Sequence, residues 1–264
     1  MSDHMTQSLD DFTTAILDDG VIDSDEVAKI KERLYEDGVI DREEADFLFA
    51  LNDAVSVKEN DPSWSDFFVE AISDHVLKDD ESPGSIDEDE AAYLIEKIKG
   101  DGSVDAVELS LLVNISANST SENPESFNNF VLDSLKEAII ADGIVDAEEV
   151  EMLQKVIYGA GGAGGADVDR VEADMLFDIN DATTSNDGHD PSWQAFFVEA
   201  ISKHVLEDEE SPGDIDESEG DWLISKVEGD GEYDENEKAL LSNIKNNAKN
   251  IAGKLKFKIE MFGS

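Results

Sequence analysis

One stretch of this 264-residue chain occurs twice, at residues 61–90 and again at residues 190–219. Between residues 61–87 and 190–216, 21 of 27 positions are identical. Each copy starts with a proline at the first turn of a predicted helix and then places apolar residues at helical spacing. These residues are Trp64, Phe68, Ile72 and Val76 in the first copy and Trp193, Phe197, Ile201 and Val205 in the second. The duplication predicts two similar halves, each with this helix buried.

Short corners with a common pattern separate the predicted helices. The corners follow the pattern Gly, any residue, Ile or Val, Asp, two further residues and Glu. In the second half, the corner at residues 166–172 has Ala in place of Gly, and the corner at residues 231–237 has Tyr in place of Ile or Val. Consecutive corner glycines stand 18 residues apart in three places, which leaves room for a helix of about three turns. No segment keeps a period of two residues, so we expect strands only as short pairings at the corners. The sequence predicts an all-α fold of two tandem homologous helical-hairpin domains.

The two repeats, together with the composition of the stretches beside them, divide the chain into four segments. We expect acidic helical repeats at residues 9–117 and 132–251, joined by a linker at residues 118–131 that is polar and contains a proline. Residues 252–264 form a basic C-terminal tail with several lysines and few acids. This tail either lies on the acidic body or serves as a docking segment. The alternation of lysine with apolar residues around Phe257 would suit the addition of a strand to a partner's sheet.

The repeated stretch ends in an acidic loop with the spacing of a calcium site. Calcium takes six to eight oxygen ligands, and the twelve-residue EF-hand loop supplies them from positions 1, 3, 5, 7, 9 and 12, with glycine at position 6. Counted from Asp79, acids stand at positions 1, 3, 9 and 12 and Gly84 stands at position 6, but Pro83 takes position 5. The candidate ligands are Asp79, Glu81, Asp87 and Glu90 in the first copy and Asp208, Glu210, Asp216 and Glu219 in the second. The loops predict EF-hand-like corners that bind Ca²⁺, or another divalent or lanthanide cation of similar size.

The same corners have an explanation that needs no ion. A glycine after a helix is the usual left-handed cap, and Asp followed three residues later by Glu has the form of a capping box. Outside the two complete loops, positions 1 and 3 are wrong for calcium, so these corners are helix caps or, at most, half-sites. The half-site residues are Asp19, Asp23, Glu26, Asp37, Asp41, Glu44, Asp101, Asp105, Glu108, Asp142, Asp146, Glu149, Asp230, Asp234 and Glu237. In the complete loops, capping leaves the acids at positions 1 and 3 unexplained, and a cation would relieve their mutual repulsion.

The net charge of -47 narrows the classes of function. With 66 acidic residues against 19 basic ones, the chain would be repelled by nucleic acid and by anionic membranes, and it would attract cations or a basic protein partner. Adaptation to salt is a rival explanation, although its usual preference for Arg over Lys is absent, with 3 Arg and 16 Lys. The chain has no cysteine, no secretory signal at its start and no stretch long enough for a membrane span, so we expect a cytoplasmic protein.

The other residues that stand out in the sequence are better explained by structural roles than by metal binding or catalysis. His75 and His204 hold the same place in the two copies, with no second histidine nearby, and this favours partly buried helix positions over metal ligation. Trp64 and Trp193 are typical of core anchors. The glycine-rich residues 159–165 lack the Lys-Ser/Thr ending of a phosphate loop, which indicates a flexible linker. No nucleophile and histidine stand together at a recognisable motif, so we expect a protein that is not an enzyme.

The repeated corners, in which Asp-Gly, a further residue, Ile or Val, Asp, two residues and Glu join two helices, resemble those of bacterial acidic helical proteins of the tellurite-resistance TerB-like type. The loops at residues 79–90 and 208–219 are similar to EF-hands. This resemblance implies an all-helical domain with acidic metal-binding surfaces, no catalytic machinery and a role in stress response. Two hypotheses remain: a calcium-binding module that acts as a buffer, sensor or ion-stabilised scaffold, and an acidic interaction scaffold that docks a basic partner without a specific ion.

Overall fold

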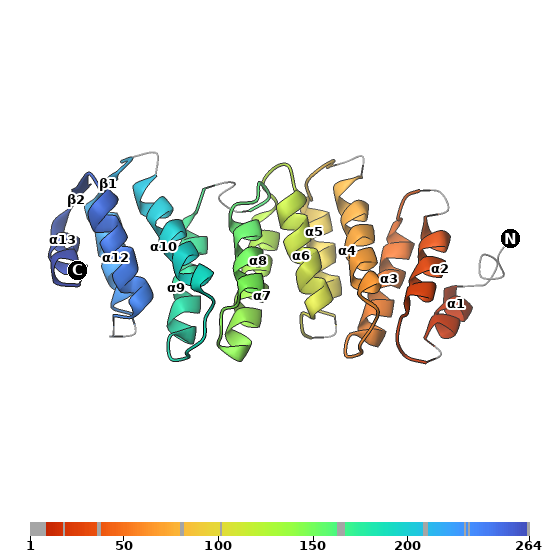
Figure 1. Ribbon diagram of the computed structural model, residues 1–264. Coiled ribbons are helices and arrows are strands. Elements are labelled where there is room, and N and C mark those ends of the chain that lie inside the picture. The colour runs from red at the N-terminus through yellow and green to blue at the C-terminus, as the bar shows by residue number, and fades with distance from the viewer. Residues whose placement is uncertain are drawn as a thin grey trace. The chain divides into compact units, whose positions relative to one another are not determined.

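The prediction of a helical protein is confirmed by a computed structural model of the chain. The structure describes residues 9–17, 19–35, 38–79, 82–100, 102–162, 167–207, 211–229, 231 and 233–262. Within these ranges lie 13 helices and one short parallel sheet (Figure 1). None of the helices described is long and apolar enough to cross a membrane.

The helices follow one another along the chain with only short connections. They are α1 (Leu9–Ile16), α2 (Ser24–Leu34), α3 (Arg42–Val55), α4 (Pro62–Leu77), α5 (Glu88–Ile98), α6 (Ala106–Asn118), α7 (Glu125–Asp142), α8 (Ala147–Ile157), α9 (Arg170–Thr183), α10 (Pro191–Leu206), α11 (Glu217–Val227), α12 (Glu235–Asn247) and α13 (Gly253–Phe262). The strands β1 (Asp214–Ile215) and β2 (Asn250–Ile251) pair in parallel, with Ile215 opposite Ile251. This pairing lies at a corner, as the sequence predicts.

The chain divides into two compact units, Met1–Val131 and Leu132–Ser264, and the boundary falls inside α7. The linker expected at residues 118–131 is therefore shorter than the sequence indicates, because its second half is the start of α7. Phe127 and Val131 account for the difference. They stand four residues apart and are both fully buried, which places them on one face of a helix.

Each unit packs around the helix of the repeated stretch, which is α4 in the first unit and α10 in the second. α4 packs mainly against α6, and α10 against α12. Trp64 and Trp193 are each 1% exposed, which confirms them as core anchors. Phe68 meets Phe49 edge-on with 5.3 Å between ring centroids, and the second unit has the same edge-on pair at 5.1 Å. This geometry is the one that aromatic rings favour.

The corner glycines turn the chain between helices in a left-handed conformation. Their φ angles lie between 75° and 93°, a range that residues with a Cβ rarely adopt. They are Gly20, Gly38, Gly84, Gly102, Gly143, Gly213 and Gly231. Residue 84 must also lack a side chain, because a Cβ there would stand 2.6 Å from Thr120 Oγ1. The glycine pattern of the sequence therefore marks turns of one kind.

The basic C-terminal segment forms a helix and not a strand. α13 packs on α11 and α12 of its own unit, with Leu255 fully buried and Ile259 only 2% exposed. Lys254 forms an ion pair with Asp221 of α11 at 3.3 Å. The hypothesis that residues 252–264 add a strand to a partner's sheet is therefore wrong for the described part of the tail. Apolar residues four apart and the ion pair with Asp221 hold this segment on its own unit as a helix.

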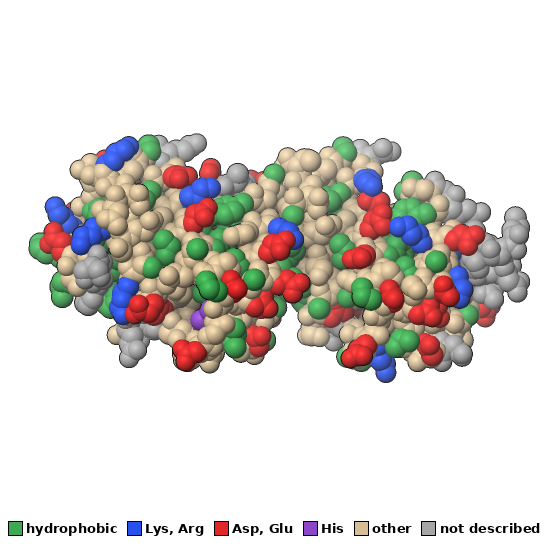
Figure 2. Space-filling model, in the orientation of Figure 1, with side chains coloured by type: hydrophobic (Ala, Val, Ile, Leu, Met, Phe, Trp, Pro, Cys, Tyr) green, Lys and Arg blue, Asp and Glu red, His purple; other side chains and the backbone are tan. Residues whose placement is uncertain are grey.

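Most of the acidic side chains lie at the surface. Figure 2 shows Asp and Glu side chains (red) spread over the face in view, with Lys and Arg (blue) among them. Three described carboxylates are buried, and they are Glu108, Glu172 and Glu237. Each of the three is the last residue of the Asp-x-x-Glu pattern of a corner.

Candidate metal centre

All eight corner Asp–Glu pairs form capping boxes. In each, the Asp side chain accepts a hydrogen bond from the backbone N–H of the Glu, and the Glu side chain accepts one from the backbone N–H of the Asp. At Asp87 and Glu90 both bonds are 2.9 Å long. The pairs are Asp23–Glu26, Asp41–Glu44, Asp87–Glu90, Asp105–Glu108, Asp146–Glu149, Asp169–Glu172, Asp216–Glu219 and Asp234–Glu237. The capping explanation is confirmed at every corner.

The aspartates before the corner glycines also bond to the backbone. Asp19 Oδ1 accepts a hydrogen bond from the Val21 N–H at 3.1 Å, and Asp142 Oδ1 accepts one from the Ile144 N–H at 2.9 Å. Asp37, Asp101 and Asp230 lie outside the described residues. In the part of the chain that the structure describes, no group of three or more His, Asp or Glu side chains could hold a metal ion. The described half-sites therefore hold their corners by hydrogen bonds.

The first complete loop, residues 79–90, gathers two carboxylates around one hydroxyl group. Ser82 Oγ lies 2.9 Å from Glu90 Oε2 and 3.3 Å from Asp79 Oδ1, and the Ser82 N–H donates to the same Asp79 oxygen at 3.0 Å. Positions 1 and 12 of the loop thus meet through position 4, while Glu81 lies outside the described residues. The sequence prediction considered only acidic residues as ligands and therefore did not identify Ser82 as part of the site. Its signal in the sequence is the Ser-Pro-Gly that both copies share.

The surroundings of Glu90 disfavour its negative charge. Burial is the largest cause that raises the pKa of the Glu90 carboxyl, and the charges of Asp79 and Asp87 raise it further. Hydrogen bonds from the Asp87 N–H and the Ser82 hydroxyl act in the opposite direction without outweighing burial. A cation in this loop would relieve the repulsion among the three carboxylates.

The second complete loop, residues 208–219, carries a lysine where the first carries a threonine. Thr120 and Lys249 hold equivalent places, since their backbone N–H groups donate to the carbonyl groups of Gly84 and Gly213 at 2.6 Å and 2.7 Å. The side chain of Lys249 donates from Nζ to the Pro212 carbonyl oxygen at 2.8 Å. An ammonium group therefore contacts this loop already. Of its predicted ligands, Asp216 and Glu219 cap α11, and Asp208 and Glu210 lie outside the described residues.

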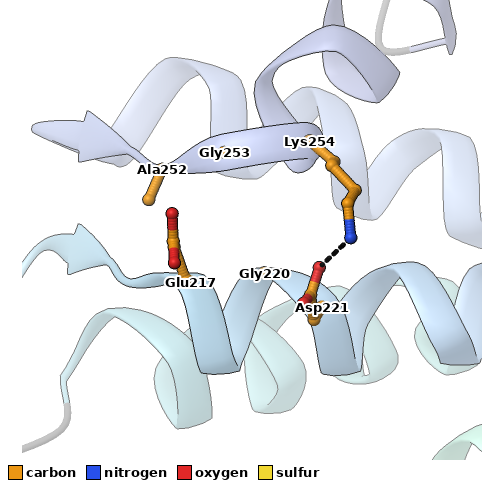
Figure 3. A pocket seen from close by; sticks show the side chains of 6 residues that line it. All are labelled: Glu217, Gly220, Asp221, Ala252, Gly253 and Lys254. Carbon is orange, nitrogen blue, oxygen red and sulfur yellow. Dashed lines mark hydrogen bonds and ion pairs between the residues drawn. The ribbon is translucent and has the colours of Figure 1, made fainter.

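A recess of about 140 Å³ lies between α11 and the start of α13 (Figure 3). Glu217 of α11 points toward Ala252, and Asp221 of α11 faces Lys254 of α13, whose ion pair with Asp221 spans the recess. Gly220 lets the two helices approach, because a Cβ there would stand 3.4 Å from the Leu255 Cβ. The recess is therefore a consequence of how α13 packs on α11, with its lysine already paired.

Comparison of the chain with protein-family models, with curated proteins and with solved structures finds no match in any of the three. The resemblance to TerB-like proteins rests on the corner motif and stays a prediction. The fold and the loops define the class: a mostly helical protein of two units whose corners are capped by paired acids.

Proposed function

We propose that this protein is a non-catalytic module that binds calcium, with residues 79–90 as its better site. The observation that carries the proposal is the convergence of Asp79 and Glu90 on the hydroxyl group of Ser82. Carboxylate, hydroxyl and carbonyl oxygens suit a hard cation, and the loop has the length and the glycine position of an EF-hand.

Helix capping and calcium binding use the same two residues of this loop. Positions 9 and 12 of a calcium loop are three residues apart, as are the two acids of a capping box. To bind calcium through both oxygens, Glu90 gives up its bond to the Asp87 N–H, and the loss of a capping interaction costs about 1 kcal/mol. The ion offsets this cost, because it neutralises the charges of Asp79 and Asp87 that disfavour ionised Glu90.

The two loops differ in what lies against them. Position 5 is proline in both, which removes a usual ligand, so we expect weak binding with a Kd of roughly 10⁻⁶ to 10⁻³ M. Lys249 places a positive charge against residues 208–219, whereas Thr120 places a neutral hydroxyl group against residues 79–90. Calcium therefore prefers the first loop. Magnesium, which demands a tight octahedron and dehydrates reluctantly, binds more weakly.

In this proposal, the two units are tandem homologous copies whose corners are EF-hand-like. Beyond the shared sequence, a matching contact supports it: the guanidinium group of Arg42 lies 3.3 Å from the ring centre of Tyr93, and that of Arg170 lies 4.1 Å from the ring centre of Trp222. Two of the chain's three arginines thus stack on an aromatic ring of the same helix in each unit, α5 or α11. Such stacking is worth about 0.5–1 kcal/mol at exposed sites.

A second candidate function is the docking of a basic partner without a specific ion, and the surplus of carboxylates favours it. If each of the 19 basic residues paired with a separate acid, 47 of the 66 acids would still have no basic counterpart. Acids are spread over the face shown in Figure 2 and not gathered in one patch. A spread of this kind gives diffuse attraction that fades as salt is added.

A matched pair of double variants tests the calcium proposal. Glu90→Gln with Glu219→Gln removes the charge at position 12 of both complete loops and keeps side-chain size. Glu26→Gln with Glu149→Gln makes the same change in two corners that lack acids at positions 1 and 3. An ion that binds only the native state stabilises it by about 2.7 kcal/mol at a hundredfold excess over Kd. We expect the first double variant to lose most of the calcium-induced rise in Tm and the second to keep it.

Two results would contradict the calcium proposal or its selectivity. If both double variants keep the rise in Tm, and calorimetry shows salt-like screening without a stoichiometry, the calcium proposal fails and the docking scaffold is favoured. Magnesium that competes as well as calcium would contradict the selectivity.

A further inference from the structure

The second unit carries an insertion that lies outside the predicted calcium loops. Asp169 follows Asp146 by 23 residues (169 − 146), whereas Asp41 follows Asp23 by 18 (41 − 23). The extra residues include much of the glycine-rich stretch 159–165. The insertion therefore changes the surroundings of one helix cap, the one at the start of α9.

Glu172, the last residue of this cap, is buried more deeply than its counterpart in the first unit. Glu172 is 0% exposed, whereas Glu44 is half-buried. Its Oε2 atom accepts a hydrogen bond from the Asp169 N–H at 2.9 Å. Its Oε1 atom is buried and has no hydrogen-bond partner among the residues that the structure describes. A buried carboxylate oxygen in this position calls for a partner.

Two backbone carbonyl oxygens lie near Glu172 Oε1, on the side of Gly162 where other residues carry a side chain. A Cβ atom on Gly162 would stand 2.7 Å from the Val156 carbonyl oxygen, 3.3 Å from the Gly159 carbonyl oxygen and 3.4 Å from Glu172 Oε1. The three oxygens therefore lie around the place that a side chain of residue 162 would fill, and the Gly159 oxygen also accepts a hydrogen bond from the Gly162 N–H at 3.1 Å. Val156 lies in the last turn of α8, where carbonyl groups lack a partner within the helix and the helix dipole favours positive charge.

Two species could satisfy these oxygens: a proton on Glu172 or a metal cation. Burial is the main cause that raises the pKa of Glu172 to about 8, so the carboxyl group resists ionisation when nothing positive is near. In a chain of net charge -47, a further buried negative charge needs a positive counterpart within contact distance. Oxygens from two carbonyl groups add nothing to the binding of a proton beyond one hydrogen bond, but they are ligands for a hard cation.

We propose that Glu172 Oε1 and the carbonyl oxygens of Val156 and Gly159 bind a hard metal cation, with water molecules completing its coordination. A mixed set of carboxylate and carbonyl oxygens suits calcium and excludes soft metals, which select sulfur ligands. The site is separate from residues 79–90 and 208–219 and does not depend on the calcium proposal for them. Because the ligand must be deprotonated, binding near neutral pH releases the proton of Glu172.

The test uses the full chain with the two loops disabled by Glu90→Gln and Glu219→Gln, and calcium chloride alone as the probe. Calorimetry near pH 7 in two buffers of different ionisation enthalpy measures both the stoichiometry and the protons released. We expect one bound calcium ion and close to one released proton. Glu172→Gln in this background should weaken binding at least about tenfold and abolish the proton release. Glu44→Gln, at the same cap position of the first unit, should leave both unchanged.

Gly162→Ala reaches the same site without changing any charge. Its Cβ would stand 2.7 Å from the Val156 carbonyl oxygen and would displace this ligand, so calcium binding should be lost while far-UV circular dichroism reports the folded state. No saturable binding in the background protein, or equal binding by the Glu172→Gln and Glu44→Gln proteins, would overturn the proposal and leave Glu172 as a buried, protonated acid. Either result leaves the loop proposal untouched, because the loops are already disabled in this experiment.

Discussion

The Nδ1 atom of His75 lies 2.8 Å from the backbone carbonyl oxygen of Ile40. The second unit repeats this contact between His204 and Val168 at 2.9 Å. A carbonyl oxygen can only accept a hydrogen bond, so Nδ1 carries the hydrogen in both rings. Each histidine thus ties the repeated helix to the corner before α3 or α9, which is a structural role, as the sequence indicates.

This geometry predicts opposite tautomers within one chain. His189 accepts a hydrogen bond at Nδ1 from the Val145 N–H at 3.0 Å, and its Nε2 lies 3.2 Å from the Thr183 carbonyl oxygen. At a pH at which the rings are neutral, NMR of the imidazole nitrogens should place the hydrogen on Nε2 in His189 and on Nδ1 in His75 and His204. The same tautomer in all three rings would show that these contacts do not form.

His189 takes the place of an asparagine in the first unit. Asn60 accepts a hydrogen bond from the Ile22 N–H at 3.0 Å and donates one to the Val55 carbonyl group at 3.0 Å. We expect His189→Asn to change the free energy of unfolding by less than about 0.5 kcal/mol. His189→Ala should lower it by about 1–2 kcal/mol, because the Val145 N–H loses its partner. Urea unfolding of both variants measures the difference, and an Asn variant no better than the Ala variant would contradict it.

Local spacing predicted the helix starts well, because a capping box is made by groups within four consecutive residues. The surroundings of each box could not be predicted in the same way. Glu44 and Glu172 occupy the same position of the pattern, yet only Glu172 is fully buried. Its burial depends on α8 and on residues of the inserted stretch, whose placement no local pattern records.

Identical tryptophans of the two copies also differ in their partners. Trp64 Nε1 donates to Asn52 Oδ1 at 3.3 Å, whereas Trp193 Nε1 is buried without a hydrogen-bond partner among the described residues. Asn180, the counterpart of Asn52, accepts a hydrogen bond from Asn236 at 2.8 Å instead, and the first unit has a valine in the place of Asn236. The competing donor comes from a helix more than 40 residues away in sequence, so the repeated stretch alone could not reveal it.

Lys249→Thr should strengthen calcium binding at residues 208–219, if these loops bind calcium as proposed. The change removes an ammonium group from the Pro212 carbonyl oxygen and supplies the hydroxyl group that the first loop has in Thr120. Removing one positive charge near a divalent ion is worth about 1 kcal/mol at a solvent-exposed site, or roughly a fivefold gain in affinity. Calorimetry in a background that carries both Glu90→Gln and Glu172→Gln isolates the second loop. Lys249→Arg keeps the charge and should bring no gain, and equal affinities for the two variants would reject this explanation.

The buried carboxyl group of Glu172 makes folding stability depend on pH. Burial is the main cause that raises its pKa to about 8 in the folded chain, from an ordinary value of 4.5. Between these values the folded state holds a proton that the unfolded state has released, so stability falls as the pH rises from 4.5 to 8 and levels off above 8. One unit of pKa corresponds to about 1.4 kcal/mol, so the loss by pH 9 is on the order of 5 kcal/mol.

Glu172→Gln removes this titration while keeping an oxygen that can accept the hydrogen bond from the Asp169 N–H. With a chelator present, so that no metal ion competes with the proton, urea unfolding at pH 5 and at pH 9 should show a smaller loss of stability in the Gln variant. Because glutamine carries no charge to bury, the variant should also be the more stable protein at pH 9. Glu44→Gln, which changes the half-buried counterpart, should follow the wild-type curve. Parallel curves for the wild type and Glu172→Gln would mean that Glu172 keeps the same ionisation when the chain folds, and the buried oxygen would then need an explanation other than a proton.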